Sequence, residues 1–142
     1  MRYIAVLFVL SAFTLSSCKK ELRTVVYTMD SYNNSGVTGT VSFIETNNKN
    51  IVTVKLEADG LVPDTPYLSH LHTGMPGNLT GTLIYFDKLR SPTGSVTQSQ
   101  NWETTYNDAI ESNTCFTIHN YTFFSNDSIG YVLAGGTGKN GK

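Results

Sequence analysis

Cysteine is scarce in this 142-residue chain, which contains only Cys18 and Cys115. If Cys18 is modified, as its surroundings suggest below, Cys115 is the one remaining thiol and no internal disulfide can form. An excess of basic residues is also lacking: without residues 1–17 the totals of 10 basic and 11 acidic residues lose only Arg2 and become 9 and 11. Without a basic patch, nucleic acid is not an expected partner. Stability must therefore come from packing, and a chain of this size can bury one core.

Familiar catalytic motifs are missing as well. No Gly-x-Ser-x-Gly occurs, so a serine hydrolase has no support. Gly135-Gly136-x-Gly138 follows a strand pattern but opens no helix, which excludes a phosphate-binding loop. The carboxylates are scattered without visible pairing. No residue is therefore assigned a catalytic role, and the sequence leaves enzymatic activity open.

Long hydrophobic runs are absent too, because the apolar run at 3–13 is too short to span a bilayer. It follows the basic start Met1-Arg2 and precedes Leu15-Ser16-Ser17-Cys18, the order typical of a secretory signal. Leu-Ser-Ser-Cys resembles the lipobox of bacterial lipoproteins, which implies a signal peptide at 1–17 and a lipid on Cys18. The alternative is an ordinary signal peptide with an incidental cysteine. The lipobox resemblance implies a membrane-anchored protein of the bacterial cell envelope, and Lys19-Lys20 favours the outer membrane because the inner-membrane retention aspartate is missing.

The rest of the chain alternates apolar and polar residues with the period of β-strands. Frequent turn residues separate the alternating stretches, which predict some seven strands at 24–29, 37–43, 52–58, 67–72, 81–87, 115–119 and 129–134. Trp102, Tyr106, Ala109 and Ile110 recur at helical spacing and predict one short helix. Segment 90–101 is polar and is interpreted as a loop. Segment 73–78 is rich in turn residues and is interpreted as a turn. The prediction is an all-β fold, a single antiparallel β-sandwich or flattened barrel at 24–134, between a linker at 18–23 and a flexible tail at 135–142.

The only three histidines of the chain, His70, His72 and His119, lie at the ends of two of these strands. Strand residues two apart point to one face, roughly 6.5–7 Å apart along the chain, so the His-x-His pair can approach a common point. A third imidazole from a neighbouring strand could complete a metal site, and imidazole suits copper and zinc. Met75 or Cys115 could add sulfur. Alternatively, the His pair is solvated on an outer face, Met75 covers a loop and Cys115 is a small buried hydrophobe.

Several short segments occur in the order of a known fold: 39–43, 52–56, Gly60-Leu61-x-Pro63, His70-Leu71-His72, 109–113 and 116–119. The first four resemble the front half of the copper/zinc superoxide dismutase fold and equally the CHRD domain, named for chordin and also found in bacterial secreted proteins. Segment 109–113 resembles the short helix of CHRD domains, and 116–119 is similar to the strand that ends in histidine in both groups. The resemblance covers roughly residues 36–134. It implies a dismutase-like Greek-key sandwich in which His70, His72 and His119 match three of four copper ligands.

The chain departs from the dismutase pattern around these histidines. Only a short turn at 73–81 follows the His-x-His strand where the zinc loop and its bridging histidine belong, and no arginine follows His119. Three hypotheses result: a lipid-anchored protein that binds copper through the three histidines for storage, delivery or slow redox chemistry; a metal-free CHRD-like interaction module with an unknown protein partner; and a copper-only superoxide dismutase.

The lipid anchor is directly testable. We expect Cys18→Ser to release the protein from membranes, because the thioether that would hold the lipid can no longer form. Fractionation of cells that express either form measures this. Retention of the variant on membranes after normal signal removal would contradict the assignment of the anchor.

Overall fold

The structure, a computed structural model, describes residues 21–120 and 130–141. These residues form eight strands and one helix: β1 Thr24–Ser31, β2 Thr38–Glu45, β3 Val52–Asp59, β4 Tyr67–Met75, β5 Asn78–Tyr85, β6 Val96–Trp102, α1 Tyr106–Glu111, β7 Asn113–Asn120 and β8 Tyr131–Gly138. The strands make one sheet in the order β5-β4-β7-β8-β1-β2-β3-β6, and every pairing is antiparallel. The predicted all-β fold with one short helix is confirmed. The signal peptide expected at 1–17 and the lipid site Cys18 lie outside the described residues.

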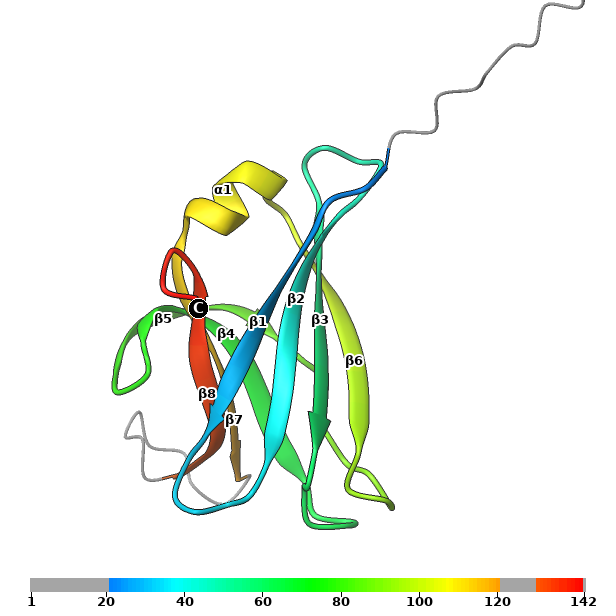
Figure 1. Cartoon of the computed structure of the whole chain (residues 1–142), viewed down its shortest axis with the longest axis vertical. Helices are drawn as coiled ribbons and strands as arrows, with labels where there is room; N and C mark the ends of the chain where they lie inside the picture. Colours follow the sequence, from blue (N-terminus) through cyan, green and yellow to red (C-terminus); the bar gives the residue numbers. More distant parts are fainter. Residues whose placement is uncertain (1–20, 121–129, 142) are drawn as a thin grey trace, which may run out of the picture.

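The sheet curls on itself around one core (Figure 1). Strand β1 joins the two halves, because its residues Thr24 to Met29 pair with β2 whereas Asp30 and Ser31 pair with β8. Side chains from both halves pack in a single cluster, and its fully buried members include Phe43, Leu56, Leu71, Phe116 and Leu133. The result is a flattened barrel, as the strand pattern predicted.

Strand β3 shows how the sequence pattern produces this core. Val52, Val54, Leu56 and Ala58 are buried, and the intervening Thr53, Lys55 and Glu57 reach solvent. A period of two places alternate side chains on opposite faces of a strand, so one face enters the core. The predicted alternation of β3 is therefore confirmed residue by residue.

The short helix α1 covers one end of the barrel (Figure 1). The Asp108 N–H donates a hydrogen bond to Oγ1 of the N-cap residue Thr105 at 3.1 Å, which satisfies a backbone donor at the helix start. Tyr106 and Ala109 are buried, as the helical spacing predicted, but Trp102 belongs to the end of β6. The described residues include no helix long and apolar enough to cross a membrane.

The interpretation of 90–101 as a loop is wrong, because β6 occupies Val96–Trp102. This strand lies at the edge of the sheet and pairs only with β3. Its sequence VTQSQNW shows no fully buried position, since its burial alternates between intermediate and exposed. An edge strand with little buried surface lacks the apolar alternation by which the other strands were predicted.

Two further boundaries differ from the prediction. The turn expected at 73–78 is tighter, because β4 continues to Met75 and β5 begins at Asn78. The tail expected to be flexible from 135 instead contributes to β8, which extends to Gly138. A Cβ atom at Gly136 would collide with the backbone of Asn140, and the Asn140 side chain donates to the carbonyls of Gly74 and Thr114, both at 3.2 Å. These close approaches tie the end of the chain to the sheet.

The assignment of faces on β4 predicts unequal effects of two leucine truncations. Leu71 is fully buried, whereas Leu83 on β5 is 40% exposed. We expect Leu71→Ala to lower the free energy of unfolding by about 2–5 kcal/mol, and Leu83→Ala by about 1 kcal/mol or less. Chemical denaturation of the two variants measures the difference. Equal losses would contradict the placement of Leu71 in the core.

Candidate metal centre

The three histidines share one face of two adjacent strands. On β4, Ser69 and Leu71 point into the core, so His70 and His72 point to the opposite face. Strand β7 pairs with β4 without a register shift and places His119 opposite Leu68. The predicted convergence of a His-x-His pair with a third histidine from a neighbouring strand is confirmed.

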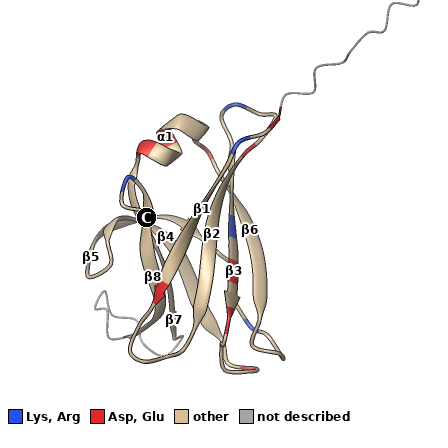
Figure 2. Ribbon diagram, viewed as in Figure 1, with Lys and Arg blue, Asp and Glu red and all other residues tan. Residues whose placement is uncertain are grey.

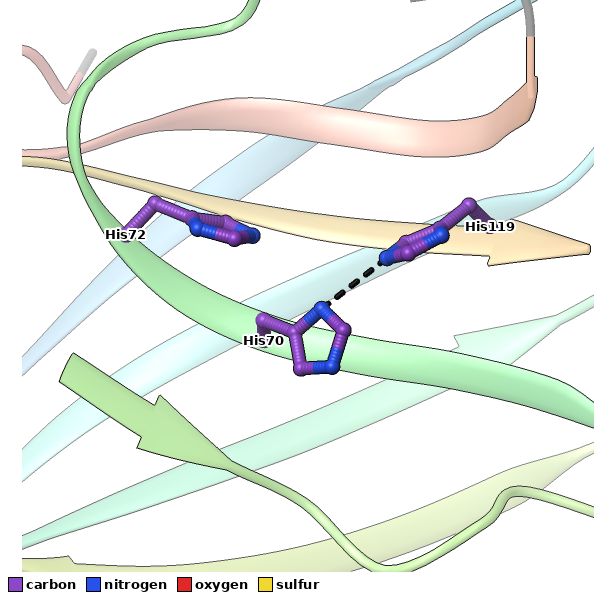
Figure 3. Close-up of side chains that lie close together, drawn as sticks. All are labelled: His70, His72 and His119. Carbon is purple, nitrogen blue, oxygen red and sulfur yellow. Dashed lines mark hydrogen bonds between the residues drawn. The ribbon is translucent and has the colours of Figure 1, made fainter. Parts of the chain in front are cut away.

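The rings face one another at short range (Figure 3). Each residue offers one ligand nitrogen, and these nitrogens all lie within 4.8 Å of one another. His119 Nε2 and His70 Nδ1 are 2.9 Å apart, so one of them donates a hydrogen bond to the other. Nitrogens at 2.0–2.1 Å from a shared tetrahedral metal lie roughly 3.4 Å apart. Small ring movements therefore suffice to bind one ion: the nitrogens of His119 and His70 would move apart, and the more distant ligand nitrogens would move closer together.

Hydrogen bonds to residues of β5 fix the orientation of the His72 ring. Its Nδ1 lies 3.2 Å from the carbonyl oxygen of Gly81 and 3.1 Å from Thr82 Oγ1. A carbonyl only accepts, so Nδ1 carries the proton and donates to Gly81, and the neutral ring has its lone pair on Nε2. This Nε2 is buried and has no hydrogen-bond partner among the described residues. A backbone carbonyl that fixes one ring nitrogen while the other stays bare is the usual arrangement of a metal-binding histidine.

The surroundings of His70 and His72 favour the neutral form of both rings. Strands β4, β5, β7 and β8 carry no charged residue, and Figure 2 shows the acidic and basic positions on other elements. Burial, with further contributions from His119 and His72, lowers the pKa of His70 to about 4. Burial also lowers the pKa of His72, although the Gly81 carbonyl partly opposes this shift. Neutral imidazoles are the form that binds metal, so these two rings need lose no proton near pH 7.

The sulfur atoms considered from the sequence lie outside this group. Cys115 is opposite His72 in the β4–β7 register, but the metal-capable group found in the described residues consists of the three histidines alone. Burial raises the pKa of the Cys115 thiol to about 12, so it stays protonated. Met75 is 45% exposed at the β4–β5 turn. These positions favour the interpretation of Cys115 as a small buried hydrophobe.

Two tyrosines contact the site, and sequence reasoning did not assign them to it. Tyr85 lies opposite His70 in the β4–β5 pairing, with ring centroids 4.9 Å apart. Tyr131 lies opposite His119 because a register shift follows Ile118, and these ring centroids are 6.0 Å apart. Register shifts of this kind redirect side chains and leave no mark in the alternation of the sequence.

The lowered pKa of His70 makes the stability of the metal-free protein depend on pH. The unfolded chain takes up a proton near pH 6.5, whereas folded His70 resists it until about pH 4. Stability should therefore fall as the pH decreases through this window. The full shift corresponds to roughly 3 kcal/mol, but the ring is partly exposed and we expect about 1–2 kcal/mol.

His70→Asn should remove this contribution, because Asn does not titrate and its side chain can imitate the Nδ1 position. Urea denaturation of both proteins at several pH values gives the two slopes. As the pH falls, the unfolding free energy of the native protein should decrease more than that of the variant. Parallel slopes would contradict the burial of a neutral His70.

Comparison with known proteins does not assign this chain to a family. No family model matches the chain, and no curated protein matches its sequence. The resemblance to CHRD domains and copper/zinc superoxide dismutases therefore stays a prediction from the motifs quoted above.

Proposed function

We propose that this protein is a lipid-anchored component of a bacterial cell envelope that binds one copper ion through His70, His72 and His119. The observation that carries the proposal is the convergence of three ring nitrogens within 4.8 Å, one of them the bare and buried Nε2 of His72. A buried polar atom without a partner costs free energy, and a bound metal would remove that cost. The three side chains come from β4 and β7, two strands that pair with each other, so the ligands need little additional ordering when a metal binds.

Copper is the favoured ion because of the donor set. Three imidazoles suit both copper and zinc, but divalent metals bind nitrogen sites in an order that places Cu²⁺ above Zn²⁺. The group found in the described residues contains no carboxylate or thiolate that would favour another ion. Three protein ligands leave at least one coordination position open, and a bound copper ion would supply Lewis acidity and one-electron redox chemistry there.

The lipid anchor in this proposal is supported by the segment Leu15-Ser16-Ser17-Cys18. Strand β1 begins at Thr24, six residues after Cys18. Six extended residues span at most roughly 20 Å. A lipid on Cys18 would thus hold the barrel close to the membrane surface.

Copper binding is tested by titration in competition with a chelator of known affinity. We expect the native domain to bind one Cu²⁺, and the His70→Ala/His72→Ala double variant to bind at least about 100-fold more weakly, because two of three ligands are gone. Met75→Leu is the matched control and should leave the affinity unchanged, since Met75 lies at the exposed turn. The same titration with Zn²⁺ should show weaker binding.

Circular dichroism of each variant confirms that it is folded. Equal and weak copper binding by the native protein and the double variant would dismiss the proposal. That result would leave the metal-free interaction module as the better hypothesis.

A further inference from the structure

Thr117 lies on the face of β7 that carries His119, next to the histidines of β4. It is directly opposite His70 in the β4–β7 register, two residues before His119 and two after Cys115. Its neighbours Phe116 and Ile118 are in the core, so Thr117 points to the face that carries the imidazoles. Directly opposite side chains on antiparallel strands have Cβ atoms about 4.5–5.5 Å apart. The Thr117 side chain therefore belongs to the floor of the metal centre.

The hydroxyl group of Thr117 has no hydrogen-bond partner among the described residues, although the residue is fully buried. His72 Nε2, on the same face of the adjacent strand, is buried and unpartnered as well. Buried polar atoms in folded proteins are nearly always hydrogen-bonded, so two such atoms in one small region need an explanation. A metal ion on His72 Nε2 that carries a further small ligand toward Thr117 would satisfy both.

The floor around Thr117 is built from small residues. Ala134 lies opposite Thr117 on β8, and Gly136 lies opposite Cys115. The side chain of Ala134 is short, whereas the backbone of Asn140 occupies the space above Gly136. His70 is the least buried of the three rings, which places the approach from solvent on its side of the site.

We propose that Thr117 is a positioning residue of the metal centre: its hydroxyl hydrogen-bonds to a small exogenous ligand, a water, a hydroxide or a small inorganic anion, in the coordination position that the histidines leave open. This inference rests on the proposed copper site. A threonine hydroxyl can accept a hydrogen bond from a bound water and donate one to a bound anion, so it serves both kinds of ligand. It is a weak metal ligand itself, and the histidines carry the affinity for the ion.

The test uses the copper-loaded protein with azide as the probe ligand, followed by the azide-to-copper charge-transfer absorption. Thr117→Val keeps the shape of the side chain and removes the hydroxyl, whereas Thr117→Ser keeps the hydroxyl. We expect the dissociation constant of azide to rise about tenfold in Thr117→Val, as loss of a hydrogen bond to an anion predicts, and to stay within about threefold of native in Thr117→Ser. The affinity for Cu²⁺ should change less than about threefold in both.

Ser69→Ala is the matched control. Ser69 is also fully buried, and its hydroxyl likewise has no partner among the described residues, but it points to the core face of β4. Its loss should leave azide binding unchanged. In the metal-free state Thr117→Val should unfold at the same temperature as native protein or higher, because it replaces an unpaired hydroxyl with a methyl group. Thr117→Ala should repeat the azide result if valine disturbs the strand.

Each outcome is decisive. Equal azide affinity in native protein, Thr117→Val and Thr117→Ser, all loaded with copper, would overturn the role of Thr117 and leave the copper site intact. Loss of copper itself in Thr117→Val, with retention in Thr117→Ser, would also overturn it, since the hydroxyl would then act on the metal. Failure of the native protein to bind copper would overturn this inference together with the proposed function.

Discussion

The antiparallel pairing of β4 with β7 is the constraint on which the candidate metal centre depends. It places Thr117 directly opposite His70, and His119 opposite Leu68, two residues before His70 on the same face. A slip by one residue would turn the imidazoles of one strand into the core, because successive side chains alternate between faces. The buried pair Leu71 and Phe116 opposes such a slip, since the same slip would expose one of them. The hydrophobic core therefore fixes the geometry of a polar site that lies on the other face of the sheet.

The distribution of charge gives this site its chemistry. Half of the sheet, β5, β4, β7 and β8, has no ionisable residue other than histidine, tyrosine and cysteine. Without a carboxylate nearby, burial dominates and lowers the pKa of His70 and His72. An acidic neighbour would have raised the pKa of these rings, and the protonated rings would have repelled a metal cation at mildly acidic pH. The ion pairs of the described chain lie elsewhere, as in the bidentate contact of Arg23 with Glu45, where Arg23 also stacks on Tyr106. That contact fastens the start of β1 to β2 and α1, apart from the histidines.

Much of this arrangement could be predicted from the sequence. Each element that was predicted correctly buries one face, and this burial leaves a pattern in the sequence. Strands such as β3 bury one face, so their apolar residues alternate, and His70 and His72 could be assigned to one face from their spacing alone. Strand β6 buries too little surface to show that pattern. The position of Thr117 opposite His70 could not be predicted, because a threonine in a strand is ordinary until its cross-strand neighbour is known. Tyr131 was missed for a related reason: its position opposite His119 depends on a register shift that pairing geometry creates.

The site and the core are physically separable, and this separation bears on why the unpaired polar atoms persist. His72 Nε2 and Thr117 Oγ1 are buried on the face away from Leu71 and Phe116, so apolar replacements there would leave the core contacts intact. Such replacements would relieve desolvated polar groups and make the metal-free barrel more stable. Because it keeps His72 and Thr117, the metal-free protein is less stable than it would be with apolar residues at these positions. Binding of a ligand to the folded state alone would return that stability, because it adds its binding free energy to that of folding. The two unpaired atoms are therefore what the proposed metal and its ligand would have to satisfy.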